Sequence, residues 1–427
     1  MGPGAGAAGG RARTLTADTG TVRSPLLLSP EGRLLFAGRA LRTFGFGWLS
    51  LILALYLERR GFSAAAIGGV FTATLVEDAV FTILVASLAQ RVGRRRVLLG
   101  SAFLITAAGA MLAMSRDPAV IVIAAVLGTL SPNGQEAGPF SALEQALLPD
   151  TVAAKARTRA FAWYNIFGFL PSALGALAAG VWQRAGRAMG LDEIASYQSM
   201  LWVYSLLGVA LAVVYSRLPH RLDAPPPAAA RPAGWRMGLH RSRGVVLQMS
   251  ALQALDSLAG GFVVQALLVY WFHLRFGAGP EVLGPLFFGT SLLSAASFLV
   301  AARLADRFGL LQTAVFTHIP SNVLLMLIPL AGSLPVAAGL LLARHLLSQM
   351  DVPTRQAYTM ALVDADERAA TAGFTASARG LAAAVAPVFT GFALARAATG
   401  LPFFLAGGLK IVYDLALYFR FRHVRLP

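Results

Sequence analysis

Acidic side chains lie inside segments that are otherwise apolar, where a charge is costly. Glu77 and Asp78 are neighbours near the middle of the apolar run 66–89, and on a helix they point about 100° apart. If that run crosses a bilayer, an ionised group at its centre costs at least about 2.5 to 3.5 kcal/mol, so it must be neutral, paired or exposed to water. Crowding two carboxylates in low dielectric favours protonation of at least one. Glu77 or Asp78 is therefore predicted to bind and release protons; the alternative is that one of them only bonds a neighbouring helix.

Other polar residues fall inside further apolar runs. Glu136, between Ser131 and Pro139, is a third candidate for proton coupling, whereas Glu144 is expected at the membrane interface. The side chains predicted to line a pathway for a solute or an ion are Arg42, Asn165, Asp256, Gln265, Arg344 and Arg379.

Opposite charges suggest three contacts. Arg42 and Asp256 are expected to meet across the two halves of the chain. Asp351 and Arg355, and likewise Lys410 and Asp414, are four residues apart and are expected to neutralise each other on one helix face.

The composition excludes a water-soluble fold. The 427 residues are 56% hydrophobic and only 13% charged, and the mean hydropathy is +0.65. A net charge of +16 would suggest nucleic acid in a soluble chain, but the arginines cluster between apolar runs, which indicates membrane topology instead. There is no cysteine, and no phosphate-binding glycine loop, His-rich cluster or nucleophile–base pattern appears. We therefore expect no enzyme, no bound metal and no cofactor.

The elements that must position these residues are transmembrane helices, because each apolar run is long enough to cross a hydrocarbon core of about 30 Å. The predicted fold class is all-α, a polytopic membrane protein of twelve helices in two pseudo-symmetric six-helix bundles. The predicted helices are 35–57, 66–89, 97–114, 119–146, 158–182, 199–217, 245–274, 282–305, 312–331, 334–361, 370–395 and 401–420.

Glycines and prolines that recur 216 residues apart indicate an internal duplication. The repeated pairs are Gly61 and Gly277, Gly93 and Gly309, Pro171 and Pro387, and Gly175 and Gly391. Between the halves lies a segment rich in proline and arginine, which is typical of a solvated linker. The predicted division is a disordered cytoplasmic tail (1–33), an amino-terminal bundle (34–217), a cytoplasmic linker (218–244), a carboxy-terminal bundle (245–420) and a second cytoplasmic tail (421–427).

Basic loops predict the orientation. Arginines follow the second predicted helix and the last one, and both groups fall on the same side of the membrane. Since basic loops remain inside, both termini are predicted to be cytoplasmic in a multi-pass protein of the cell membrane.

The six-plus-six layout, the basic central loop and one turn together resemble the major facilitator superfamily, from about Leu34 to Arg420. The turn reads Ser87-Leu-Ala-Gln90-Arg91-Val-Gly93-Arg94-Arg95-Arg96, with Ser87 and Gln90 where the family has Gly and Asp. A second copy, Arg303-Leu-Ala-Asp306-Arg307-Phe-Gly309, keeps the acid. The resemblance implies that these loops latch one bundle against the other, through Gln90, Arg91, Gly93, Arg94, Arg95, Asp306, Arg307 and Gly309.

The resemblance also implies secondary active transport of a small solute by alternating access. The segment from Gly168 to Gly175, with Pro171, is similar to the family's antiport motif and favours proton-coupled efflux; packing of small residues is the alternative explanation. Uptake of a nutrient or metabolite, or a receptor-like protein that transports nothing, are the competing functions. The expected partners are the lipid bilayer, the solute and protons, with no nucleic acid, and the protein is expected to be a monomer.

Overall fold

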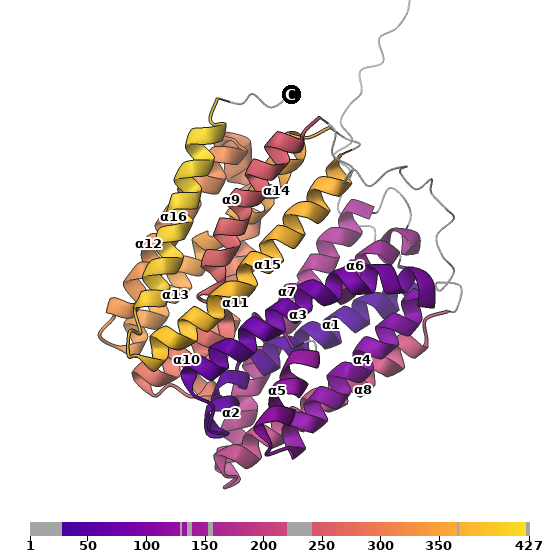
Figure 1. Cartoon of the computed structure of the whole chain (residues 1–427), viewed down its shortest axis with the longest axis vertical. Helices are drawn as coiled ribbons and strands as arrows, with labels where there is room; N and C mark the ends of the chain where they lie inside the picture. The colour runs from indigo at the N-terminus through magenta and orange to yellow at the C-terminus, as the bar shows by residue number, and fades with distance from the viewer. Residues whose placement is uncertain are drawn as a thin grey trace, which may run out of the picture.

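A computed structural model describes residues 28–128, 130–134, 139–152, 157–219, 241–364 and 367–423. In these ranges the regular structure is helical throughout (Figure 1). Glu136, residues 1–27 of the predicted amino-terminal tail, residues 220–240 of the predicted linker and residues 424–427 lie outside the described residues. The division into five segments therefore stays a prediction at those points.

The first half of the chain forms the amino-terminal lobe. Its helices are α1 (Pro30–Ser50), α2 (Leu53–Arg59), α3 (Ala64–Val92), α4 (Arg94–Met114), α5 (Pro118–Leu127), α6 (Pro139–Leu147), the 3₁₀ helix η1 (Leu148–Thr151), α7 (Arg157–Ala188) and α8 (Glu193–Ser216).

The second half forms the carboxy-terminal lobe. Its helices are α9 (Arg243–Gly261), α10 (Gln265–Phe276), α11 (Pro280–Phe308), α12 (Leu310–Leu327), the 3₁₀ helix η4 (Ile328–Leu330), α13 (Leu334–Ser348), α14 (Asp351–Ala361), α15 (Arg368–Ala395) and α16 (Leu401–Phe421).

The predicted all-α membrane fold is confirmed. Among the described residues, nine spans are long and apolar enough to cross a membrane, and a tenth is the pair α1 and α2, bent by 43°. The two other predicted crossings are broken, into α5 and α6 and into α13 and α14. Large apolar side chains such as Phe103 and Phe419 are more than half exposed, as expected of helices whose solvent is lipid.

Local sequence signals set the helix ends. Ser29 and Ser63 accept hydrogen bonds from the backbone N–H groups of Gly32 and Ala66, at 3.1 and 3.2 Å, and so cap α1 and α3. Tight turns follow helices at glycines with positive φ, and the turns are repeated in the two lobes: Gly61 (87°) and Gly277 (66°), and Gly93 (104°) and Gly309 (89°). An L side chain rarely adopts such angles, so the recurring glycines mark equivalent backbone turns.

The packing of the helices also repeats. In the amino-terminal lobe α1 packs on α7 and α4 on α8; in the other lobe α9 packs on α15 and α12 on α16. The lobes meet through two equivalent pairs, α3 with α15 and α7 with α11, and their ribbons approach near α2 and α10 and diverge toward the end that carries the C-terminus (Figure 1).

Glycines permit the closest helix crossings. Within the amino-terminal lobe, a Cβ on Gly47 or Gly175 would collide with the backbone of Ser172 or Phe44, so α1 and α7 touch through their main chains. Small residues of this kind are what allow membrane helices to approach closely.

We expect Gly175→Val to lower the free energy of unfolding by about 1 to 3 kcal/mol or more, because the added side chain has no space against α1. The apparent thermal midpoint in detergent measures this loss. Gly100→Val is the matched control, since Gly100 lies in α4 of the same lobe with nothing within 4 Å of an added Cβ. Equal midpoints for the two variants would contradict the packing account.

Candidate functional site

A fully buried ion pair joins α1 to α6. Arg42 Nη1 and Nη2 donate to Oε1 and Oε2 of Glu144 at 3.0 and 2.8 Å, and both side chains are 0% exposed. The hydroxyls of Tyr164 on α7 and Tyr215 on α8 donate to the same carboxylate at 2.8 and 2.7 Å. The prediction that Glu144 lies at the interface is wrong: donors from three other helices make its burial affordable.

One aromatic ring lies against each of the two buried cations of α1. The Arg42 guanidinium lies 4.4 Å from the ring centroid of Phe140, and that of Arg39 lies 3.8 Å from the centroid of Tyr164. Arg39 Nε also donates to the backbone oxygen of Tyr164 at 2.7 Å. These contacts compensate part of the desolvation of both arginines.

Asp256 on α9 is the centre of a second buried cluster, in the carboxy-terminal lobe. Its Oδ1 accepts from Lys410 Nζ on α16 at 2.5 Å, and its Oδ2 accepts from Arg355 Nη1 on α14 at 2.7 Å. The same Nη1 of Arg355 lies 3.1 Å from Asp351 Oδ2, so this predicted pair is present but shared. The predicted contact between Arg42 and Asp256 is wrong, because the carboxylate of Asp256 is bound by two cations of its own lobe.

Asp414 on α16 has partners on another helix. Its carboxylate oxygens are bonded to His318 Nδ1 at 2.9 Å and to Asn322 Nδ2 at 3.2 Å, both on α12. The predicted pairing of Lys410 with Asp414 is therefore wrong. Each residue reaches a neighbouring helix instead of the other, which ties α16 to α9 and to α12.

The two clusters are related by the internal repeat, with the signs of charge exchanged. In the amino-terminal lobe the cation is on α1 and the carboxylate on α6; in the carboxy-terminal lobe the carboxylate is on α9 and the cation on α14. Sequence reasoning missed this relation. The sequence held one signal for it. Arg42 and Asp256 are close to 216 residues apart, so they stand on equivalent helices of the two lobes, and each needed an opposite charge on a later helix of its own lobe.

Two predicted pathway arginines have no carboxylate partner among the residues that the structure describes. Arg344 is half-buried on α13, and its guanidinium forms neither a hydrogen bond nor an ion pair with any described residue. Arg379 on α15 is also half-buried, and its Nε donates to Ser257 Oγ at 3.1 Å. His345, beside Arg344, has its Nδ1 2.8 Å from the oxygen of Leu341, which is a bond within the helix.

Glu77 is an unpaired carboxyl group in the middle of α3. Both of its oxygens are buried, and neither has a hydrogen-bond partner among the described residues. Asp78 follows on the adjacent face and is half-buried. The Cβ of the next residue, Ala79, lies 3.7 Å from the position that a Cβ on Gly380 of α15 would take, so the two acidic residues lie beside the seam between the lobes. Their role in proton coupling remains a prediction.

Gln265 and Asn165 occupy different environments. Gln265, at the start of α10, donates through Nε2 to Ser50 Oγ at 2.9 Å, and the next N–H, of Ala266, donates to Pro132 O at 3.0 Å. Gln265 thus joins the lobes where they meet. Asn165 is exposed on α7.

The predicted latch loops are tight turns in both lobes. Gly93 and Gly309 end α3 and α11 with positive φ, and Arg95 Nη2 donates to Ser216 O of α8 at 2.8 Å, a contact within its own lobe. Asp306 forms no hydrogen bond or ion pair with a described residue. The guanidinium carbon of Arg307 lies 5.3 Å from the centroid of the Phe308 ring. Gln90, Arg91 and Arg94 lie on these turns, and the latch role of the loops remains a prediction.

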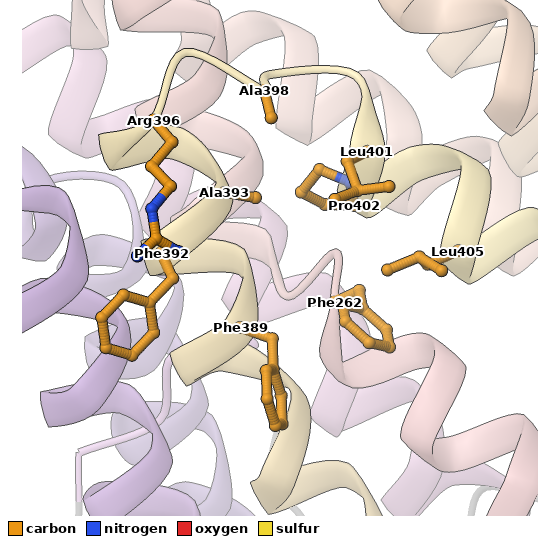
Figure 2. Close-up of a pocket in the computed structure, with 9 residues that line it drawn as sticks. All are labelled: Phe262, Phe389, Phe392, Ala393, Arg396, Ala398, Leu401, Pro402 and Leu405. Carbon is orange, nitrogen blue, oxygen red and sulfur yellow. The ribbon is translucent and has the colours of Figure 1, made fainter.

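A pocket of about 420 Å³ lies where α9, α15 and α16 meet (Figure 2). Its lining is apolar except for Arg396, and Phe389, Phe392 and Leu401 are each about half exposed. None of the predicted site residues lines it. Exposed aromatic and aliphatic side chains of this kind are suited to lipid chains, so the charged clusters are the better candidates for a solute site.

We expect Glu144→Gln to destabilise the protein by about 3 to 5 kcal/mol, because it leaves Arg42 buried without a counter-charge. The double change Arg42→Gln with Glu144→Gln should cost less than the single one. Thermal unfolding in detergent measures both. Glu193→Gln is the control, since its ion pair with Arg59 is 43% and 29% exposed and should be worth about 1 kcal/mol or less. A Glu144→Gln protein as stable as the control would exclude a structural ion pair.

Comparisons with known proteins agree with this architecture. The chain is 25% identical over 418 residues to the "Uncharacterized membrane protein YJR124C" of Saccharomyces cerevisiae, covering 91% of this chain and 93% of that protein. An aspartate-to-alanine variant of the nucleoside transporter NupG has a similar structure, with a TM-score of 0.72 and 13% identity over 91% of this chain and 99% of that one. The D-xylose-proton symporter gives a TM-score of 0.71 and 16% identity over 91% and 97% of the chains. The family profile described as Major Facilitator Superfamily matches residues 35–387, and the chain therefore belongs to the major facilitator superfamily.

Proposed function

We propose that the protein is a secondary transporter that carries a small solute across its membrane by alternating access, coupled to protons. Membership of the superfamily and a fold shared with nucleoside and D-xylose carriers support transport of a small solute. The observation that carries proton coupling is the buried carboxyl group of Glu77, which has no partner among the described residues.

The contacts within and between the lobes suit a rocking motion. Inside each lobe, buried ion pairs join several helices, which makes each lobe a rigid unit. Between the lobes, glycines allow close backbone approaches, Gly68 against Gly391 and Gly180 against Gly284. Such contacts bring backbones together without interlocking side chains, so the lobes separate there with few ionic bonds to break.

Glu77 is suited to carry the proton. An ionised carboxylate without a partner is costly in a membrane helix, whereas the protonated form is neutral. Its position beside the seam of α3 and α15 lets the opening of the lobes change its exposure to water. Asp78 is the second member of the pair. At the 216-residue offset stand Leu293 and Ser294, so this acidic pair is absent from the second repeat.

Efflux is the proposed direction, with both termini in the cytoplasm of a cell and the protein in its cell membrane. Efflux rests on the segment from Gly168 to Gly175. In the structure these two glycines also face Arg39 and the backbone of α1, a packing role that is independent of direction. Uptake is the alternative function, and the sign of proton movement distinguishes the two.

We expect Glu77→Gln to abolish solute-driven proton movement in proteoliposomes while leaving exchange of labelled solute for unlabelled solute. The change removes the ionisable group but retains the shape of the side chain. A luminal pH dye reports protons during addition of a panel that contains nucleosides, D-xylose and small carboxylates. Asp78→Asn should give the same loss if the two carboxyl groups share one proton.

Glu193→Gln serves as the control, because Glu193 is the first residue of α8 and its side chain is partly exposed. Proton movement that persists unchanged in Glu77→Gln and in Asp78→Asn would remove the coupling role of this pair. If no solute in the panel moves or exchanges in the unaltered protein, the transport proposal itself fails in favour of a receptor-like protein.

A further inference from the structure

In the described part of the chain, the interior of the carboxy-terminal lobe holds more positive charge than its carboxylates neutralise. Arg355 and Lys410 bind Asp256, and Arg355 also binds Asp351, so these two cations balance two carboxylates. The next carboxylate along α16, Asp414, is bonded to His318 and Asn322.

Two further cations, Arg344 and Arg379, therefore remain beyond this balance. Arg379 on α15 donates to Ser257, the residue after Asp256 on α9, and Arg344 lies on α13, the helix directly before α14, which carries Asp351 and Arg355. Neither forms an ion pair with a described residue, and Nε of Arg344 is buried without any hydrogen bond. A guanidinium presents five N–H donors, so most of the donors of Arg344 are left for a ligand.

Arg42 of the amino-terminal lobe is a structural arginine and can be compared with Arg344. Both terminal nitrogens of Arg42 bind Glu144, and its side chain is 0% exposed, so a solute does not reach this group. At the 216-residue offset, Arg344 and Arg379 correspond to Gly128 and Trp163. The unbalanced arginines are thus particular to the second repeat, and no requirement of the shared scaffold accounts for them.

We propose that Arg344, with Arg379, binds the transported solute, and that this solute is a small anion with a carboxylate or phosphate group. The inference rests on the proposed transport function and names its substrate class. A planar guanidinium matches the two oxygens of such a group with parallel hydrogen bonds. The bound anion supplies the counter-charge that the lobe lacks, so solute entry relieves an electrostatic cost that the empty protein bears.

Asp256 and Asp351 limit which anions fit. Their charges are already bound by Arg355 and Lys410, so they do not occupy Arg344, but they repel a second negative group placed near them. Anions with a single charged group at one end are therefore expected to bind better than those with charged groups at both ends.

The experiment is a binding measurement on the purified full chain in detergent at constant ionic strength. The probes are lactate, glycerol 3-phosphate, inorganic phosphate and succinate, with glycerol, D-xylose and choline as neutral and cationic comparisons. We expect at least one monovalent or phosphate-bearing oxyanion to raise the thermal midpoint in a saturable way, and the neutral and cationic probes not to do so. In Arg344→Gln the apparent Kd should rise about 30-fold or more.

Arg344→Lys keeps the charge but loses the fork of donors, so it should bind more weakly than the native protein and better than Arg344→Gln. Arg379→Gln should also weaken binding, whereas Arg396→Gln, an exposed arginine at the end of the same helix, should not. Without ligand, Arg344→Gln should be no less stable than the native protein, because it breaks no ion pair among the described residues.

The anion site is overturned if no oxyanion in the panel stabilises the native protein, if neutral probes do so equally, or if Arg344→Gln and Arg379→Gln bind oxyanions as the native protein does. Its failure is distinguishable from failure of the transport proposal. Proton-coupled flux of a neutral solute would refute the anion site and keep transport, whereas oxyanion binding with no flux or exchange would refute transport and keep the site.

Discussion

A charge inside a hydrocarbon layer must find an opposite charge or a set of hydrogen bonds, and this requirement organises the interior of the protein. The carboxylate of Glu144 accepts from both terminal nitrogens of Arg42 and from the hydroxyls of two tyrosines. Asp256 is held between two cations from different helices. Helices that carry such partners cannot slide independently, because separating them would leave a charge in low dielectric.

The same requirement explains why the fully buried ion pairs lie inside the lobes, whereas Arg187 and Glu281, which pair between the lobes at 2.6 Å, are partly exposed. The buried ionic contacts described above lie within one lobe or the other. The crossings between lobes are made by glycines and by a few polar contacts at one end, such as Gln265 with Ser50. With this distribution of contacts, the two lobes are expected to move relative to each other at their interface, as in transporters with duplicated bundles.

The departures from the repeat are where function is expected. Turns at Gly93 and Gly309 and the packing of α1 on α7 and of α9 on α15 are common to both halves, so they belong to the scaffold. Glu77, Arg344 and Arg379 have apolar, small or aromatic residues at the equivalent positions. Each is an ionisable group on a long, largely apolar helix that forms no ion pair with a described residue and that the repeated scaffold does not require.

The sequence by itself determined the membrane fold, the approximate positions of most helices, the repeated turns, and which charged residues stand within apolar segments; the breaks inside the predicted helices 119–146 and 334–361 appear only in the structure. The features that the sequence determined follow from local properties: the length of an apolar run, a glycine at a turn, and a charged residue in an apolar segment. Asp351 and Arg355 pair along one helix as their spacing predicts, but the tertiary structure decided the charge pairs that join different helices. Lys410 and Asp414 are correctly spaced for a bond along one helix, yet each is bonded to another helix, and Glu144 is interior although it stands near a helix end. Pairing depends on which helix faces are brought together from distant parts of the chain, and sequence spacing carries no information on that geometry.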